Sequence, residues 1–417
     1  MLKNKFFRDS QKRSNSSANR DPEGTVRLYG ERGSRDLNSK NEFFRASPHF
    51  SLFTATGAYN LGDELILLQE YTYLKNRYPQ ATFSVFTYDE ESSLLPEDSC
   101  IKYISYFPHY FKKRPLQNIG YFLQTVLTIR KSDMIIIGGG GLLYDNEEGQ
   151  DFNKLLRQWK FRVGLAKFFH KPIIYWSLGI HLKEENKRKI LPLFTGENIF
   201  ISLRDAESKK TLESIGIKSI LLPDPVLSYD PEIPKLLIKQ RPKIGLSFRS
   251  GFLQDELENI EKIIAFLMAH GYEPILLNHS FHKDNLSTND NIFLSNLEEK
   301  YQLRSTKNIK ETLEIYKELE FVVGMRLHSL ILSLVHAIPF FAISYGKKTD
   351  EFVRSLNYEY SLAARMFDIE IFKKQFMKLE EEKNEQKFAL SAKNDILKRE
   401  IYFTTNNFFN GLESIKR

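Results

Sequence analysis

From residue 49 onward, the apolar and polar positions of the chain alternate between two patterns. Short runs rich in β-branched and aromatic residues, at 50–56 and 81–87, predict strands. Leucines and tyrosines spaced three and four positions apart over 63–78 predict a helix between them. The segment 133–137 is apolar on both faces, which is typical of a parallel strand covered by helices. This order predicts repeated βαβ units.

The same alternation starts again after residue 242. Strands are expected over 243–248, 273–277 and 321–324, with a helix over 255–270. The longest stretch without a formal charge, 327–345, contains two histidines and a proline. It therefore predicts a buried helix followed by a strand, and not a membrane span.

The fold class expected from these patterns is α/β, with two Rossmann-like doubly wound domains facing each other across a cleft. A chain of 417 residues exceeds what one core usually supports. Five prolines between 222 and 242 indicate a stiff linker. We expect a disordered tail, an N-terminal domain, a C-terminal domain and a charged helical segment, with the boundaries 1–47, 48–230, 231–364 and 365–417.

The net charge of +7 is concentrated in the tail, since residues 1–47 hold 11 Lys/Arg and 6 Asp/Glu. The nearly neutral remainder argues against nucleic-acid binding, which needs a concentrated basic face. The tail is rich in Ser, Asn and Arg and lacks apolar periodicity, which is typical of a solvated, disordered segment. Weak electrostatic contact with an anionic membrane is the alternative.

A single cysteine, Cys100, excludes a disulfide framework and a cysteine-rich zinc site. The sequence shows no metal-ligand spacing, and no apolar run follows a basic start as in a secretory signal. We therefore expect no metal, no transmembrane segment and a cytoplasmic protein, with the inner face of the membrane as the alternative location. The oligomeric state is left open.

In doubly wound sheets, ligands bind at the carboxyl ends of the strands, and the first such place is the loop after residue 56. A turn and a helix cap explain Gly62 and Asn60. They leave the adjacent carboxylates Asp63 and Glu64 unexplained, so this loop is a candidate site, with Asn60, Gly62 and Glu64 as candidate substrate contacts.

Four consecutive glycines, 138–141, follow the strand that ends at residue 137. They indicate close approach of a phosphate to backbone N–H groups, with tight packing as the alternative. Gly139, Gly140 and Gly141 are the candidate contacts. Neither the dinucleotide fingerprint nor the P-loop pattern is met. Two further segments, 202–208 and the Pro-Asp-Pro at Asp224, favour local structural roles.

In the second domain, cationic residues follow the predicted strands. Arg249 ends the first strand and can grip a carboxylate or phosphate, and His279 follows the next. Arg326 and His328 begin a helix, where the N-terminus already favours an anion. With Lys348 they indicate a site for a small, multiply charged anion, and His328 is suited to move a proton.

Six motifs in order resemble those of the polysaccharide pyruvyl transferases, over about residues 50–355. They are Gly57-Ala-Tyr-Asn-Leu-Gly-Asp-Glu, Ile-Gly-Gly-Gly-Gly-Leu-Leu-Tyr-Asp145, Leu-Arg-Asp-Ala-Glu-Ser208, Asp224-Pro, Met-Arg-Leu-His-Ser329 and Ile-Ser-Tyr-Gly-Lys-Lys348.

The resemblance implies a two-domain fold similar to B-type glycosyltransferases. It also implies transfer of the pyruvyl group of phosphoenolpyruvate onto a sugar of a cell-surface polysaccharide or its precursor, giving a ketal and phosphate. Arg326, Leu327 and His328 are then expected to hold the donor, assisted by Arg249 and Lys348. The acceptor, which is nucleotide-linked, lipid-linked or polymeric, is placed in the first domain. No cofactor beyond phosphoenolpyruvate is implied.

The donor chemistry requires protonation of a methylene carbon before a hydroxyl can attack. We hypothesise that His328 supplies this proton and that Asp63 is the base for the acceptor hydroxyl. A nucleotide-sugar glycosyltransferase is one alternative, and it would release a nucleoside diphosphate. A catalytically inactive binding member of the same fold is the other.

Overall fold

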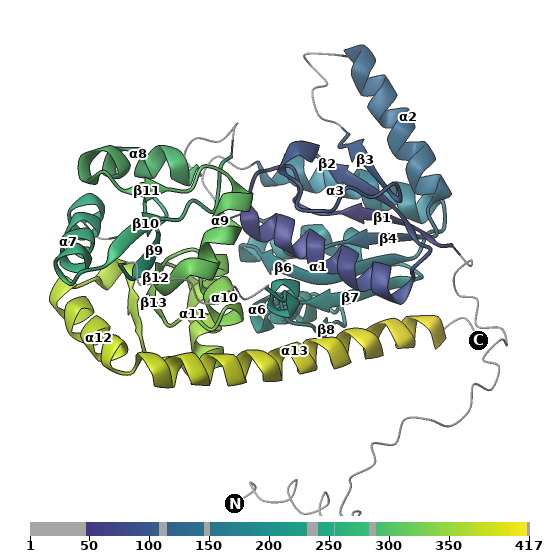
Figure 1. The fold of residues 1–417 in the computed structure, drawn as a ribbon. Coiled ribbons are helices and arrows are strands. Elements are labelled where there is room, and N and C mark those ends of the chain that lie inside the picture. The colour runs from purple at the N-terminus through teal and green to yellow at the C-terminus, as the bar shows by residue number, and fades with distance from the viewer. Residues whose placement is uncertain are drawn as a thin grey trace, which may run out of the picture. The chain divides into compact units, whose positions relative to one another are not determined.

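The computed structural model describes residues 47–107, 115–145, 151–231, 241–253, 255–282 and 289–414. The predicted basic tail, apart from its last residue, lies outside these ranges. Two parallel sheets organise the described chain, and every strand pair in both sheets is parallel (Figure 1). We call them, with their helices, the N-terminal and C-terminal lobes.

The sheet of the N-terminal lobe has the strand order β3-β2-β1-β4-β6-β7-β8, with β5 also paired to β6. Its order reverses between β1 and β4, which makes their carboxyl ends the switch point of the lobe. The elements are β1 (His49–Phe53), α1 (Leu61–Arg77), β2 (Thr82–Thr87), β3 (Ile101–Ser105), α2 (Pro115–Lys131), β4 (Met134–Ile137), β5 (Gly140–Tyr144), α3 (Phe152–Phe168), β6 (Ile173–His181), α4 (Glu184–Lys187), α5 (Leu191–Phe194), β7 (Ile199–Leu203), α6 (Ala206–Ser214) and β8 (Ile220–Leu221).

The sheet of the C-terminal lobe has the order β11-β10-β9-β12-β13-β14 and reverses between β9 and β12. The elements are β9 (Lys243–Ser247), α7 (Glu256–Ala269), β10 (Glu273–Leu276), α8 (Asp290–Tyr301), β11 (Arg304–Ser305), α9 (Ile309–Ile315), β12 (Leu319–Gly324), α10 (Leu327–Val335), β13 (Phe340–Ser344), α11 (Lys347–Leu356), β14 (Ser361–Ala363), α12 (Ile369–Glu381) and α13 (Lys383–Ser414).

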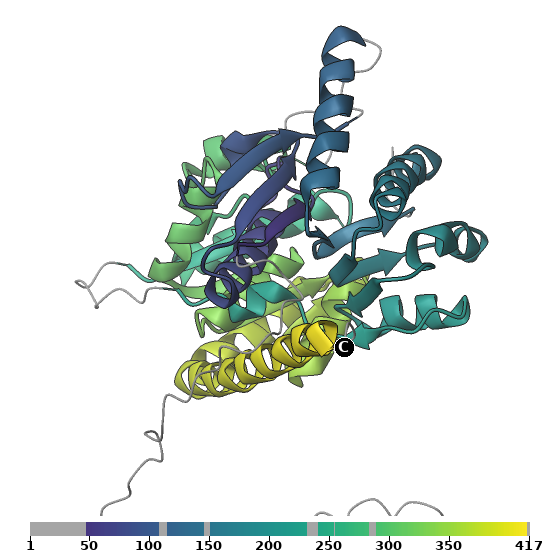
Figure 2. The same cartoon turned by 90° about the vertical axis from the view of Figure 1, so that its right-hand side faces the viewer.

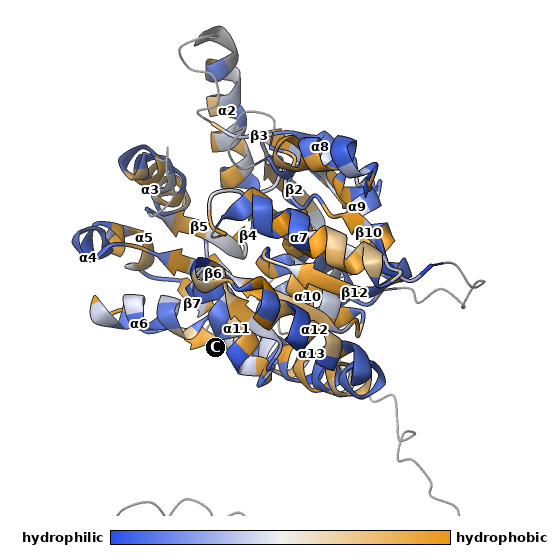
Figure 3. Ribbon diagram, turned by 90° about the vertical axis from the view of Figure 1, so that its left-hand side faces the viewer, coloured by the Kyte–Doolittle hydropathy of each residue, from blue (hydrophilic) through white to orange (hydrophobic). Residues whose placement is uncertain are grey.

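Each sheet carries a hydrophobic core on both faces. In the N-terminal lobe, one face packs on residues of α2, α3 and α5, and the other packs on α1 and the end of α13. The strands are predominantly hydrophobic in Figure 3, whereas helices such as α8 and α13 also carry hydrophilic residues. Burial on both faces explains why the strands are apolar throughout rather than alternating.

Helix α13 belongs to both lobes. It runs along the C-terminal lobe and continues beneath the N-terminal lobe (Figure 1). Leu390 and Ile401 join the core of the C-terminal lobe, and Phe409 and Leu412 join that of the N-terminal lobe. Near its end, Glu413 pairs with Arg77 at 2.9 Å. The helical segment predicted for residues 365–417 therefore packs on both lobes.

The predicted fold class is confirmed, with two local differences. The glycine run, expected as a loop, continues into β5 from Gly140 onward. The proline-rich linker includes a buried turn, Pro225–Ser228, whose Val226 lies in a hydrophobic core. The last strand of the first sheet ends at Leu221 and the next sheet begins at Lys243, with the predicted boundary at residue 230 between them.

Candidate active site

The two lobes meet through loops that follow β1 and β10. Residues 59–61 lie antiparallel to residues 279–281, and the backbone N–H of Leu61 donates to the carbonyl of His279 at 2.9 Å. A second hydrogen bond of 2.9 Å links the other ends of the two segments. These bonds bring the carboxyl ends of the two sheets together.

Side chains in the first of these loops hold the loop itself. The Asn60 carboxamide accepts from the Gly62 N–H at 3.0 Å and caps α1. Glu64 is buried and accepts from Ser92 at 2.7 Å and from two residues of the preceding loop. Burial raises the pKa of Glu64 to about 7, despite these hydrogen bonds. Asn60 and Glu64 were predicted to contact the substrate. In the structure, their side chains are bonded to their own loop and its neighbours.

His328 lies between the lobes, one residue into α10. A Cβ added to Gly62 would come within 2.0 Å of its Nδ1, so only glycine at position 62 leaves room for the ring. Its Nε2 is 3.6 Å from Oδ2 of Asp224, which belongs to the N-terminal side. Gly62 therefore leaves the space that the His328 ring occupies. This role differs from the predicted substrate contact.

Asp224 lies between His328 and Arg204 and interacts with both side chains. The Arg204 Nη1 lies 3.2 Å from the same Asp224 oxygen. Burial alone would raise the pKa of Asp224, but the charges of His328 and Arg204 outweigh it and lower the pKa to about 2. Asp224 is therefore ionised throughout the neutral range. The structure places both residues in the site, although the sequence favoured local structural roles for them.

Asp63 lies next to this cluster at the start of α1. Burial raises its pKa to about 6, and the positive charges of His328, Arg204 and Lys348 limit the rise. Its carboxylate lies over the glycine run, since a Cβ at Gly140 would meet Oδ1 at 2.9 Å. Asp63 is thus mostly ionised at neutral pH and can accept a proton.

The glycine run makes room for charged side chains. A Cβ at Gly138 would lie 2.3 Å from Glu70 Oε2, and a Cβ at Gly141 would lie 3.4 Å from Lys348 Nζ. The Gly138 N–H donates to a backbone carbonyl of β1, and the Gly139 N–H donates to Glu70 at 2.8 Å. The amide of Gly139 is therefore engaged within the protein, in contrast to the predicted phosphate contact.

Glu70 lies on α1 behind the glycine run and is fully buried. Burial raises its pKa to about 8, and the hydrogen bond from Gly139 offsets only part of this rise. At neutral pH the group is mostly neutral, which makes its place in the core tolerable.

Arg326 pairs with Asp290 inside the C-terminal lobe, as an ion pair. Asp290 also accepts from the backbone N–H groups of His279 and Ser280 at 3.0 and 3.1 Å. The His279 side chain is buried, with Nε2 2.9 Å from the Tyr316 hydroxyl. The His279 side chain is therefore held inside the C-terminal lobe, and its predicted substrate contact stays a prediction.

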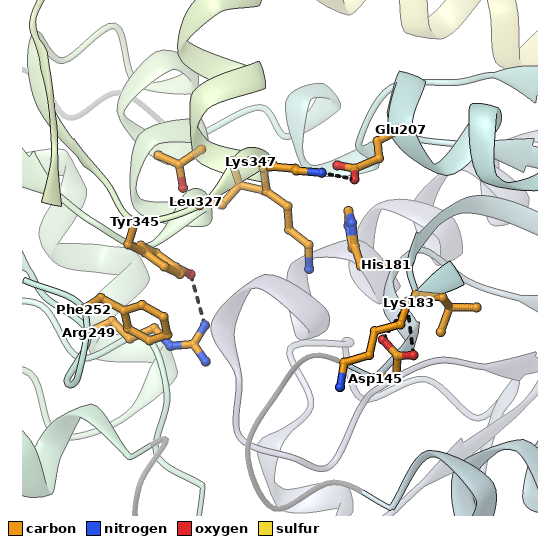
Figure 4. Close-up of a pocket in the computed structure, with 13 residues that line it drawn as sticks. Asp145, His181, Lys183, Glu207, Arg249, Phe252, Leu327, Tyr345 and Lys347 are labelled. Carbon is orange, nitrogen blue, oxygen red and sulfur yellow. Dashed lines mark hydrogen bonds and ion pairs between the residues drawn. The ribbon is translucent and has the colours of Figure 1, made fainter. Parts of the chain in front are cut away.

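A cavity of about 410 Å³ opens between the two lobes beside this cluster (Figure 4). One wall comes from the ends of β5 and β6 and the start of α6, and the other from the ends of β9 and β13 and the starts of α10 and α11. The lining residues are Asp145, His181, Leu182, Lys183, Glu207, Arg249, Phe252, Leu327, Tyr345, Gly346, Lys347, Lys348 and Thr349.

Cations and aromatic rings form the C-terminal wall. Arg249 donates to the Tyr345 hydroxyl at 3.1 Å, and its guanidinium lies 4.9 Å from the Phe252 ring centre. Lys347 reaches across the cavity and pairs with Glu207 at 2.8 Å (Figure 4). The structure thus brings Arg249, Leu327 and Lys348 to one cavity, whereas Arg326 and His328 are not among the lining residues of this cavity.

On the opposite wall, the sequence interpretation missed His181 and Lys183. Burial, followed by the charges of Lys348, Arg204 and Lys347, lowers the pKa of His181 to about 2, so the ring is neutral. His181 ends β6 and Arg204 follows β7, so the strand-end rule could have identified both. Asp224 lies in one of the six family motifs, but only the tertiary structure shows that its turn meets His328.

The described residues contain neither a metal-binding cluster nor a membrane-spanning helix. Within the ranges that the structure covers, no three His, Cys, Asp or Glu side chains gather closely enough to hold a metal ion. Among the helices of those same ranges, none combines the length and hydrophobicity needed to cross a lipid bilayer.

The family model of polysaccharide pyruvyl transferases matches residues 60–347, which include the cluster of His328, Asp224 and Arg204. The chain belongs to the polysaccharide pyruvyl transferase family. The resemblance of the six motifs is thereby confirmed, and with it the assignment to the transferases. No curated protein matches the chain by sequence.

Solved structures share the architecture of this family member at low sequence identity. A putative UDP-N-acetylglucosamine 2-epimerase from Listeria monocytogenes has a TM-score of 0.56 at 11% identity, covering 88% of this chain and 97% of its own. Anabaena Alr3699/HepE, solved in complex with UDP, has a TM-score of 0.53 at 12% identity, covering 86% and 100%. At these identities, the likeness concerns the two-lobed fold alone.

Proposed function

We propose that this pyruvyl transferase moves the pyruvyl group of phosphoenolpyruvate onto two hydroxyls of a sugar, in a cell-surface polysaccharide or its precursor. The observation that carries the proposal is the cluster of His328, Asp224 and Arg204, which both lobes build beside one cavity. The products are a cyclic ketal and inorganic phosphate.

The charge of the cavity suits the donor. Phosphoenolpyruvate carries a carboxylate and a phosphate, and Arg249 and Lys348 line the cavity with two positive charges. Guanidinium groups bind both anions in bidentate fashion, and ammonium groups add a compact charge. Leu327 gives the cavity an apolar contact for the methylene end of the donor.

His328 is suited to the first chemical step. A proton moves from its ring to the methylene carbon of the donor, which leaves a cationic carbon that one sugar hydroxyl attacks. The carbon–oxygen bond to phosphate then breaks as the second hydroxyl forms the ketal, and the proton of this second hydroxyl leaves with the phosphate. Asp224, ionised and 3.6 Å from Nε2, orients the ring and stabilises its positive charge before transfer.

Asp63 is our candidate for the base. Its pKa of about 6 leaves it ionised at neutral pH, yet close enough to neutrality to accept a proton from an attacking hydroxyl. The charges of His328, Arg204 and Lys348 around it allow the proton to pass within one cluster. This arrangement supports proton removal on the N-terminal side of the cavity and proton delivery from the C-terminal side.

Arg326 has a supporting role in this proposal. Its ion pair with buried Asp290 fixes the turn between β12 and α10, and that turn presents Leu327 and His328. A direct contact with the donor, which the family resemblance implies, can be made beside this ion pair, because a guanidinium carries five N–H donors.

The test mixes the purified full chain with phosphoenolpyruvate and candidate acceptors that are nucleotide-linked, lipid-linked or polymeric. We expect phosphate release that depends on the acceptor and a product whose NMR spectrum shows a ketal carbon and a methyl group. A parallel reaction replaces the donor with UDP-sugars. Nucleoside diphosphate release there, without phosphate release from phosphoenolpyruvate, would contradict the proposal and favour a glycosyltransferase.

A further inference from the structure

Helices α2 and α3, on the outer side of the N-terminal lobe, carry an unusual surface. Figure 2 shows them next to each other at the edge of this lobe, and the Phe122 and Phe161 rings pack together at 6.0 Å between centres. We call the exposed part of these two helices the α2–α3 face. It lies away from the candidate active site, whose residues come from other elements.

An apolar stripe runs along α2 in contact with solvent. Ile119, Leu123 and Leu127 are 56%, 52% and 52% exposed, and Phe122 beside them is 37% exposed. They are spaced three and four positions apart, so they lie on one side of the helix. Phe168 at the end of α3 is 73% exposed. A contiguous stripe of this kind marks an interaction surface more often than single exposed leucines do.

The charges within the two helices have one sign, and the exposed Asp151, which caps the start of α3, is an acidic neighbour. Neither Pro115–Lys131 nor Phe152–Phe168 contains a single Asp or Glu, although the chain has 53 of them. Five basic side chains of the two helices are exposed: Arg130, Lys131, Lys154, Arg157 and Lys160. The face is therefore apolar and basic, while the body of the protein is nearly neutral.

We propose that the α2–α3 face docks on an anionic lipid bilayer, with α2 lying in the membrane interface. A helix with one apolar side and basic neighbours binds such a surface in two ways. Its apolar side chains are buried among the lipids, and its basic side chains are attracted to the anionic headgroups. A protein partner fits less well, because lysine is depleted in the buried parts of protein interfaces. The inference does not depend on the pyruvyl-transfer proposal.

The experiment measures co-flotation of the full chain with vesicles of phosphatidylglycerol and phosphatidylcholine, compared with phosphatidylcholine alone. We expect binding to the anionic vesicles that weakens as salt rises. The double variant Leu123→Asp/Leu127→Asp should lose at least about tenfold in binding. The double variant Arg157→Glu/Lys160→Glu should lose roughly fivefold per charge.

The matched control is Phe388→Asp/Ile396→Asp, which changes two residues of α13 that are 78% and 59% exposed. It should bind as the parent chain does, and circular dichroism should show all variants folded. Unchanged binding of Leu123→Asp/Leu127→Asp would overturn the proposal and assign any attraction to other segments, such as the basic residues 1–47. Sedimentation showing that the parent chain forms dimers and the variant does not would also overturn it, since the face would then be a contact between copies.

Discussion

The two lobes place opposite chemistry near the cavity. On the N-terminal side, the carboxylates Asp63, Glu64 and Glu70 are held next to glycines or buried hydroxyls, and burial raises their pKa values to about 6, 7 and 8. On the C-terminal side, Arg249 and Lys348 are cations beside aromatic rings and open space.

This difference follows from solvation. A carboxylate withdrawn from water exchanges protons near neutral pH, whereas a cation open to a cavity stays charged and binds anions. His328 does not follow this division. It belongs to the C-terminal lobe, but it contacts Asp224 and packs against Gly62, which both belong to the N-terminal lobe. The comparison therefore assigns proton handling to the contact between the lobes and donor binding to the C-terminal wall.

His328→Ala tests whether proton transfer depends on the contact between the lobes, and we expect the largest effect from this variant. Removing the proton donor should lower turnover by roughly 10²–10⁴-fold, while KM for phosphoenolpyruvate changes little. Steady-state kinetics check this. His270→Ala is the matched control, since His270 is exposed at the end of α7, and it should retain full activity. Equal turnover of the two variants would remove His328 from the mechanism.

Asp224→Asn tests whether the contact between the lobes supports His328. The neutral amide cannot stabilise a charged ring, and we expect turnover to fall by roughly 10–100-fold. A drop in kcat without a matching rise in KM would distinguish this effect from weakened donor binding. Parent-like kcat would show that Asp224 is structural.

Lys348→Ala tests whether the C-terminal wall of the cavity binds the donor. Loss of one charge next to the anion should raise KM for phosphoenolpyruvate roughly tenfold or more. Lys347→Ala provides an adjacent control, because Lys347 is 77% exposed and already paired with Glu207. We expect less than about threefold change there. Isothermal titration with phosphoenolpyruvate gives the same comparison without turnover.

Gly62→Ala tests whether room for the His328 ring is essential. The added methyl group would overlap the ring, and we expect a loss of about 1–3 kcal/mol in the free energy of unfolding together with reduced turnover. Gly164→Ala in α3 has open space around it and should gain roughly 0.5–1 kcal/mol. Urea denaturation measures both. A stable Gly62→Ala variant with full activity would contradict the packing argument.

Glu70→Gln tests the buried carboxyl through pH. The folded state keeps this proton up to about pH 8, while the unfolded chain releases it near its ordinary pKa, so stability should fall as pH rises between them. The slope is on the order of 1 kcal/mol per pH unit. Glutamine can still accept from Gly139 and should flatten the decline. Glu197→Gln, at an exposed position, should not change it.

Much of the fold was predictable because local patterns and the buried cores agree. The apolar run 133–137 became β4, and the uncharged stretch 327–345 became α10 and β13. In the site, the strand-end rule selected Arg249 and Lys348, which line one cavity. Asn60 and Glu64 also follow a strand end, but in the structure their side chains hold their own loop.

The sequence by itself determined the layered α/β architecture, the family motifs and the cationic character of the C-terminal strand ends, because these depend on periodicity and on residues close together in the chain. Only the tertiary structure decided which charges meet. Asp224, Arg204 and His328 are far apart in sequence, and their pairing depends on how two sheets pack across the loops at 59–61 and 279–281. The same packing sets the burial of Asp63 and Glu70, and burial, a property of the folded chain, is what raises their pKa values.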